Sequence, residues 1–275
     1  MAKALEAGVK LAVFVKRHSW ILAFVLMFGL WEAATYWHLI GRTLLASPRE
    51  VWEVLTRSVQ SSTLDHNQNV YIHAFYTFRR ALTGWGLTVV GGIAFGLLTG
   101  SFEALYIGTE PIVEFARVIP PVLALPLLLV AFNYGEPAYT WTIVFGCLPV
   151  MTFAVARGIR GISQEKLELL AAYKVPGVVR GFSVVMETLP SVFLGARLTL
   201  TMELIIAVVT EMVFTPRNGW ALGALARDSE ISFDTPLFYA CVVVVGLFGY
   251  LANIGIRKIE ELLGVAPSGN ETDKV

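Results

Sequence analysis

Charged residues inside otherwise apolar segments are the positions at which this sequence could do chemistry. Glu203 lies between Thr199 and Thr210, at intervals that place all three on one face of a helix. A carboxylate at the middle of a bilayer costs about 2.5–3.5 kcal/mol, so we expect Glu203 to face protein or water rather than lipid. This polar face indicates either a route for a solute or a structural ion pair, with Arg197 or Arg117 as the partner.

Arg117 and Arg197 complete this set of candidates for a translocation pathway. We expect both to lie near the cytoplasmic ends of their segments, where a long side chain reaches the membrane surface, or else to contact an anionic solute. An unpaired Glu203 would repel an anion. If the solute is an anion, we therefore expect Glu203 to be paired or protonated.

The sequence contains no arrangement typical of an enzyme or a metal centre. It has no nucleophile with an adjacent base, no pair of catalytic carboxylates and no Gly-x-x-x-x-Gly-Lys-Ser/Thr loop that would hold nucleotide phosphates. The histidines are scattered without the spacing of metal ligands: His18, His38, His66 and His73. We therefore expect no catalytic residue, no metal and no cofactor in this chain.

The composition indicates a membrane protein. Of 275 residues, 56% are hydrophobic and only 15% are charged, whereas soluble domains have roughly 25% charged residues. The net charge is zero, so no basic surface favours nucleic acid as a partner. Both cysteines lie in apolar segments, where we expect buried free thiols.

Six apolar segments are long enough to cross a bilayer as helices, since about 20 apolar residues span the hydrocarbon core. Prolines interrupt the third segment, so we expect that helix to be kinked. The sequence thus predicts an all-α fold, a single polytopic membrane domain over 1–275 with about six transmembrane helices. The segments lie near 20–39, 81–101, 112–132, 139–156, 191–214 and 235–256.

The second apolar segment carries small residues at every fourth position. Such a row forms a smooth helix face against which another helix packs closely. We favour this packing role over a glycine-lined conduit for solute. The residues are Gly84, Thr88, Gly92, Gly96 and Gly100.

The distribution of lysine and arginine predicts the orientation. Positive residues concentrate in 1–19, 157–190 and 257–275, which the positive-inside rule places in the cytoplasm. Five arginines between residues 42 and 80 oppose this bias and make it moderate. No small-residue cleavage site follows the first apolar segment, so we expect an uncleaved anchor there.

The segment 157–190, the longest of the expected cytoplasmic loops, has the pattern of two short amphipathic helices. Apolar residues recur at helical intervals on both sides of Pro176–Gly177, and the pattern ends at Leu189–Pro190. Glycine can supply the positive φ that such a turn often needs. A plain connection would be shorter, so we expect a docking element for another protein.

Here the sequence resembles the permease subunits of binding-protein-dependent ABC importers. In this loop those permeases have a Glu-Ala-Ala run, a glycine four positions beyond it, and Leu-Pro about a dozen residues later. At these places the sequence has Ala171-Ala172-Tyr173, Gly177 and Leu189-Pro190. Ala171 replaces the glutamate of the run, and Glu168 lies one turn earlier.

Further motifs resemble the permeases of nitrate, sulfonate, taurine and bicarbonate importers. Those proteins share Ser-Pro-x-x-Val-Trp, then Arg-x-x-Pro-Pro leading to Pro-Leu, then Phe-x-x-Gly-Glu. In this sequence the motifs are Ser47 to Trp52, Arg117 to Leu127, and Phe132 to Glu136. Together the resemblance covers residues from about 44 to 262.

The resemblance implies a type I ABC importer permease in the bacterial inner membrane, with both termini cytoplasmic. Two permease copies would enclose the pathway, two ATPase subunits would bind ATP and magnesium, and a periplasmic or lipid-anchored binding protein would deliver a small anion. Vitamin precursors or aromatic solutes are the alternative cargo. A secondary transporter is a weaker alternative, since it leaves the loop unexplained and predicts an inverted repeat that the sequence lacks.

The resemblance also implies roles for two sets of residues. Coupling to the ATPase would involve the expected cytoplasmic loop, at Glu168, Ala171, Ala172, Tyr173, Lys174, Gly177, Leu189 and Pro190. Docking of the binding protein would involve an expected outer segment, at Arg217, Asn218 and Trp220. An interfacial tryptophan would explain Trp220 nearly as well.

Overall fold

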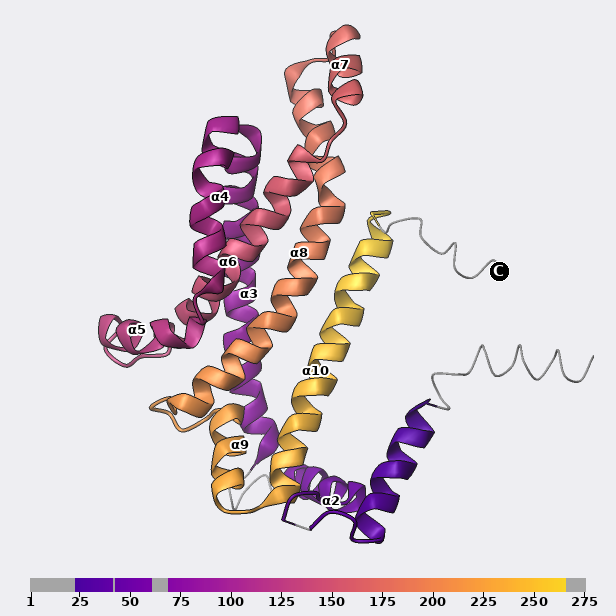
Figure 1. Cartoon of the computed structure of the whole chain (residues 1–275), viewed down its shortest axis with the longest axis vertical. Coiled ribbons are helices and arrows are strands. Elements are labelled where there is room, and N and C mark those ends of the chain that lie inside the picture. Colours follow the sequence, from indigo (N-terminus) through magenta and orange to yellow (C-terminus); the bar gives the residue numbers. More distant parts are fainter. Residues whose placement is uncertain (1–22, 42, 61–68, 266–275) are drawn as a thin grey trace, which may run out of the picture.

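The computed structural model describes residues 23–41, 43–60 and 69–265. Within these ranges the regular elements are helices and no strand occurs, which confirms the predicted all-α fold. After a helix at Ala23–Tyr36, the elements follow in the order shown in Figure 1: α2 (Pro48–Gln60), α3 (Val70–Ser101), α4 (Glu103–Val118), η2 (Pro121–Ala124), α5 (Leu125–Ala131), α6 (Pro137–Arg160), α7 (Gln164–Ala172), α8 (Gly177–Val213), α9 (Leu222–Ile231) and α10 (Thr235–Leu262).

Among the described residues, four helices have the length and apolar composition to cross a membrane, namely α3, α6, α8 and α10. A fifth span is possible if α4 and the η2–α5 segment are counted together. These helices correspond to five of the six expected segments. The remaining expected segment, the first in the chain near 20–39, begins outside the described residues. Its described part, Ala23–Tyr36, is a shorter apolar helix.

The expected kink in the third segment is a sharp break. α4 ends at Val118, and the chain turns by 88° before η2 and α5. Ile119 and Pro120 both have extended backbones with ψ of 121°. Each precedes a proline, whose ring disfavours helical geometry in the preceding residue. The consecutive prolines therefore redirect the chain, and α5 lies across the bundle rather than along it (Figure 1).

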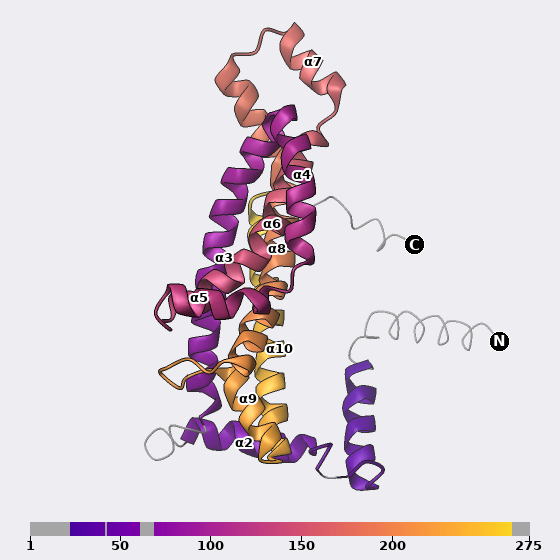
Figure 2. The ribbon, with the colours of Figure 1, turned by 60° about the vertical axis from the view of Figure 1, so that its left-hand side comes forward.

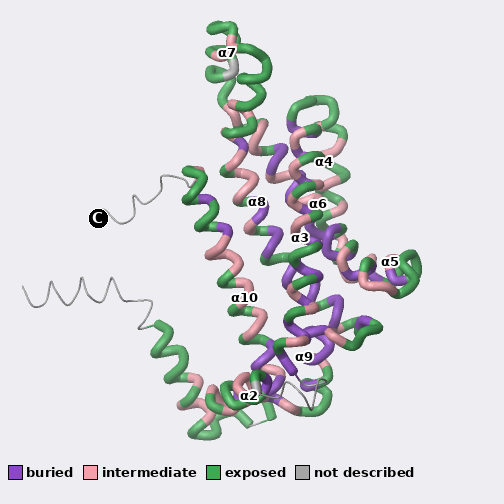
Figure 3. Tube along the Cα trace, turned by 180° about the vertical axis from the view of Figure 1, so that it is seen from behind, coloured by how far each residue is buried: buried purple, intermediate pink, exposed green. Residues whose placement is uncertain are grey.

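The centre of the molecule is formed by α3, α6 and α8, where buried residues concentrate (Figure 3). The small-residue row of α3 contacts α6 directly, as the sequence predicted. A Cβ atom on Gly96 would lie 2.5 Å from the Cβ of Val155 and 2.8 Å from the carbonyl oxygen of Thr152. Only glycine permits this approach of two helix backbones.

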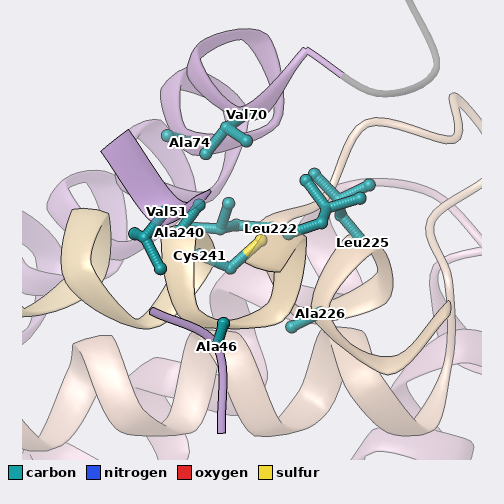
Figure 4. Packing of buried hydrophobic residues seen from close by; sticks show 10 residues of the cluster. Ala46, Val51, Val70, Ala74, Leu222, Leu225, Ala226, Ala240 and Cys241 are labelled. Atoms are coloured by element: carbon teal, nitrogen blue, oxygen red, sulfur yellow. The ribbon is translucent and has the colours of Figure 1, made fainter. Parts of the chain in front are cut away.

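A second core closes one end of the bundle, which we call the α9 end; the opposite end, where α7 lies, is the α7 end. Here α2 crosses beneath the other helices (Figures 1 and 2). Residues from α2, α3, α9 and α10 converge on one apolar cluster (Figure 4). The indole Nε1 of Trp31 donates a hydrogen bond to the carbonyl oxygen of Ala46 at 2.8 Å and joins the helix Ala23–Tyr36 to this cluster.

The expectation of two short helices in 157–190 is confirmed for the first helix and wrong for the second. α7 is a separate short helix, but the second predicted helix is the first part of α8, which continues through Pro190 to Val213. A proline removes one backbone donor, and a long helix tolerates this loss with a local bend. The loop is also shorter than predicted, because α6 extends to Arg160.

Candidate functional site

The α7 end carries a tip formed by α7, the following turn and the start of α8, which projects beyond the other helices (Figure 2). Its surface is exposed and partly apolar: Tyr173 is 79% exposed and Val178 is 86% exposed. Lys174 closes α7 in the left-handed conformation, with φ of 49°. The positive φ of this turn therefore belongs to Lys174 and not to Gly177, which begins α8.

The structure gathers most of the predicted coupling residues at this tip. Glu168, the Ala171–Lys174 run and Gly177 are all exposed there. Leu189 and Pro190 lie further along α8, where that helix joins the bundle beside the buried Thr188. An ion pair between Lys166 of α7 and Glu187 of α8 ties the tip to the long helix.

The polar residues predicted for the pathway lie on one face of α8, and that face is buried within the chain's own bundle. Thr199, Glu203 and Thr210 are each 0% exposed. Both threonine hydroxyls donate to backbone carbonyls of α8 itself, at 3.0 Å to Gly195 and 2.7 Å to Ile206. These threonines are thus satisfied inside their own helix.

Glu203 has no cationic partner among the residues that the structure describes. Both carboxylate oxygens are buried without a hydrogen bond of regular geometry, as is the hydroxyl of Thr88. Thr88 of α3 and Cys147 of α6 are the polar side chains beside it. Glu203 therefore occupies a buried polar position where three helices meet.

The predicted ion-pair alternative for Glu203 is wrong for both arginines. Arg197 pairs instead with Glu260 of α10, and the guanidinium of Arg117 lies 5.7 Å from the centre of the Phe153 ring. Neither arginine therefore compensates the charge of Glu203: Arg197 is engaged with α10 and Arg117 with the Phe153 ring of α6.

A charge network at the α9 end was not found from the sequence. Arg80 of α3 is only 2% exposed and donates to two carboxylates. Its Nε and Nη2 atoms bind Glu136 at 2.6 and 2.7 Å, and its Nη1 atom binds Glu211 at 2.7 Å. Glu211 also accepts hydrogen bonds from Thr77 at 2.7 Å and from the backbone of Gly223 at 3.1 Å. Every buried charge in this network is therefore compensated.

The network also fastens the loop between α8 and α9. Arg80 Nη1 donates to the carbonyl oxygen of Trp220 at 2.9 Å, and the side-chain amide of Asn218 donates to Glu136 at 2.8 Å. Trp220 and Asn218, two of the predicted docking residues, are thus held in place by hydrogen bonds within the chain. The available sequence signal was Arg80 at the start of an apolar segment, together with the Phe-x-x-Gly-Glu motif that supplies Glu136.

Arg217, the third predicted docking residue, lies apart from this network at the rim of a cavity of about 200 Å³. Its guanidinium lies 5.5 Å from the centre of the Tyr134 ring. The hydroxyl of Tyr139 donates to the carbonyl oxygen of Phe214 at 3.1 Å and forms one wall. The cavity is lined by Leu129, Tyr134, Tyr139, Phe214, Thr215 and Arg217.

Within the described part of the chain, no three histidine, cysteine, aspartate or glutamate residues lie close enough together to hold a metal ion. Cys147 and Cys241 are buried free thiols, as the sequence predicted.

The long apolar helices, the projecting tip at the α7 end and the hydrogen-bonded loop between α8 and α9 define a polytopic helical membrane protein. The chain belongs to the family described as binding-protein-dependent transport system inner membrane components, which matches residues 92–263. The resemblance noted in the sequence is thereby confirmed at the level of the family.

Several relatives share most of their length with this chain. The nitrate import permease NrtB of Leptolyngbya laminosa is 22% identical, over 84% of this chain and 82% of the relative. The taurine transport permease TauC of Escherichia coli is 24% identical, over 87% and 86% of the two chains. The bicarbonate transport permease CmpB of Synechocystis is 22% identical, over 86% and 87%.

Among solved structures, the fold is similar to a chain of the MetNI methionine ABC transporter in an inward-facing conformation. The TM-score is 0.61 at 18% sequence identity, and the match covers 68% of this chain and 93% of that chain. At this identity the likeness establishes the shared fold.

Proposed function

We propose that this chain is the permease subunit of an ATP-driven importer for a small anionic solute. The carrying observation is that full-length relatives at similar identities include permeases for nitrate, taurine and bicarbonate. These solutes share a small size and a negatively charged oxygen-bearing group. A permease for such anions fits the same family and the same fold.

The proposed assembly contains two copies of this chain, two cytoplasmic ATPase subunits that hold ATP and magnesium, and an external binding protein. Because the sequence has no Gly-x-x-x-x-Gly-Lys-Ser/Thr loop, we assign the nucleotide sites to the ATPase subunits and no cofactor to this chain. In this arrangement the α7 end faces the cytoplasm, both termini are cytoplasmic and the α9 end faces outward in the bacterial inner membrane. The charge distribution of 157–190 supports this orientation.

The exposed tip supports a role in coupling. An open surface that fits a cleft on the ATPase is formed by Glu168, the Ala171–Lys174 run and Gly177. Leu189–Pro190 lie where α8 passes from this tip into the bundle. α8 is one helix of 37 residues, about 55 Å long at 1.5 Å per residue. Because α8 continues as one helix from the tip through Pro190 into the bundle, closure of the ATPases at the tip would also move the bundle part of α8.

The buried position of the α8 polar stripe changes the proposed pathway. Thr199, Glu203 and Thr210 face α3 and α6 of the same chain, so we assign them to the internal packing of the moving unit. Arg117 and Arg197, engaged with Phe153 and Glu260, are likewise assigned to structure. The solute then passes along surfaces that the two copies form together, outside each three-helix centre.

Uptake by the reconstituted complex tests this function. The chain, its ATPase and its binding protein would be placed in vesicles, and ATP-dependent entry of labelled nitrate, taurine and bicarbonate would be measured. Calorimetry on the binding protein would identify its ligand independently. Uptake of at least one of these anions supports the proposal, whereas uptake of a neutral vitamin precursor or aromatic solute alone would refute the assigned cargo.

A further inference from the structure

We propose that the cavity beside Arg217 is a binding site for a small oxyanion at the α9 end. The inference deepens the proposed function and rests on it for the passage of the solute. The site itself is argued from charge, shape and hydrogen-bonding capacity. It assigns to Arg217 a role in receiving the solute rather than in docking the binding protein.

The charge argument begins with the other arginines of this end. Arg80 is neutralised by Glu136 and Glu211. Arg227 pairs with Asp228 and donates to the carbonyl oxygen of Met212 at 3.0 Å. Arg217, in contrast, has no acidic partner among the described residues, and its guanidinium lies over the Tyr134 ring. Arg217 therefore places at the cavity rim a positive charge that no described acidic side chain pairs.

The shape argument concerns the segment between α5 and α6. Asn133 and Tyr134 have φ angles of 50° and 58°, a left-handed conformation that is rare for a bulky residue such as tyrosine. Two backbone hydrogen bonds hold it, from Tyr134 to Leu129 at 2.6 Å and from Gly135 to Phe132 at 2.9 Å. Such strain persists only where the surrounding structure enforces it, and it clusters at functional sites. Here it places the Tyr134 ring against Arg217.

The hydrogen-bonding groups of the cavity favour an acceptor with several oxygens. Arg217 offers the planar donors that match nitrate, sulfonate or carboxylate. The hydroxyl of Tyr134 makes no hydrogen bond within the described residues, and Thr215 accepts one from Arg227 at 3.0 Å, so both have a proton to donate. Leu129 and Phe214 add apolar surface for a short carbon stem.

The size of the cavity suits a small solute. Its volume of about 200 Å³ is below the roughly 300–1,000 Å³ typical of pockets for drug-sized ligands. A small oxyanion fits within this volume, and the cavity opens to the surface of the protein. The site thus provides an observation on this chain, independent of its relatives, that favours the anionic cargo over the alternative.

Cysteine labelling tests the charge of the cavity without requiring transport. Thr215→Cys would be introduced into the full chain, and the chain would be assembled with its ATPase in lipid nanodiscs. Both native cysteines are buried, so the reagent should react with the introduced cysteine. We expect sulfonatoethyl methanethiosulfonate to react about tenfold faster than its trimethylammonium analogue, since unit charges a few ångströms apart attract or repel even in water. Adding Arg217→Gln should lower the ratio severalfold, and part of it should remain because Arg227, whose Nη2 donates to Thr215 at 3.0 Å, stays beside the labelled position.

Protection by anions tests binding. Nitrate and ethanesulfonate should slow the reaction of Thr215→Cys with a neutral maleimide, and Arg217→Gln should abolish the protection. Arg57→Gln is the matched control, because Arg57 is an exposed arginine of α2 at the same end and outside the cavity. Equal protection with and without Arg217, or no protection at all, overturns the proposal.

The outcomes separate the site from the transport function and from docking. Anion-protected labelling in a complex that transports no anion retains the site and refutes the cargo. Anion uptake with normal KM in Arg217→Gln refutes the site and retains the cargo. Loss of affinity for the binding protein in Arg217→Gln, with unchanged labelling ratios, makes Arg217 a docking residue and refutes the proposal.

Discussion

Arg80 is the residue on which the α9 end depends, because it binds two carboxylates from different parts of the chain. Glu211 is 0% exposed and has no other cationic partner among the described residues. Buried ion pairs contribute little relative to apolar substitutes, but removal of one partner leaves a charge without compensation. This asymmetry decides what a single substitution at Arg80 does.

We expect Arg80→Gln to destabilise the protein by about 3–5 kcal/mol, because Glu211 would remain buried and unpaired. Thermal unfolding of the purified complex measures the effect. Arg79→Gln, at the adjacent exposed position, should leave the melting temperature unchanged. The double variant Arg80→Gln with Glu211→Gln should recover part of the loss, and a purely additive loss would contradict the pairing.

Glu203 presents the opposite case. It is buried without a cation beside it. No ion pair stabilises its negative charge, whereas burying that charge costs free energy. We expect Glu203→Gln to assemble normally and to unfold at the same temperature or higher, since glutamine keeps the shape of the side chain and removes the buried charge. A fall in melting temperature comparable with that of Arg80→Gln would show that the carboxylate has an essential partner.

At the scale of elements, the contact between α3 and α6 sets the geometry of the bundle. Gly96→Ala would place a methyl group 2.8 Å from the Thr152 carbonyl oxygen, a backbone atom that cannot move independently. We expect a loss of about 1–3 kcal/mol, as for overpacked cores. Gly86→Ala on the same helix meets nothing within 4 Å and should be neutral or stabilising. Thermal unfolding of both variants in parallel checks the difference.

The tip formed by α7 and the start of α8 allows a test of coupling with a substitution that leaves the folding of the chain undisturbed. A Cβ on Gly177 would meet nothing within 4 Å, so Gly177→Val should fold normally. We expect uptake to fall at least tenfold while the complex stays in the membrane, because the added side chain would intrude on the proposed ATPase cleft. Gly255→Val on α10, also in open space, is the control, and unchanged uptake by Gly177→Val argues against the proposed coupling role of the tip.

For the whole molecule, the continuous helix α8 links the exposed tip with the braced loop. The proposed orientation places these two ends on opposite sides of the membrane. In intact cells we expect Thr215→Cys to react with an impermeant maleimide and Tyr173→Cys to react only after permeabilisation. The reverse pattern would invert the topology and remove the α7 end from contact with a cytoplasmic ATPase.

Much of the architecture was predictable because its causes are local in sequence. Apolar length determines which segments span a bilayer, and the spacing of Gly84 to Gly100 determined a close helix contact. The consecutive prolines at 120 and 121 predicted a bend but not its 88° size. The continuation of α8 through Pro190 was missed, because a proline pattern is compatible with either a helix start or a bent interior.

The partners of the charged residues were decided by tertiary structure alone. Arg80 binds carboxylates 56 and 131 positions away, and Arg197 binds Glu260 rather than Glu203, although Glu203 lies closer in sequence. Helical periodicity states which face a side chain occupies, and bilayer energetics state that a buried charge needs compensation. Neither states which distant segment the fold brings within about 3 Å, the distance at which an ion pair forms.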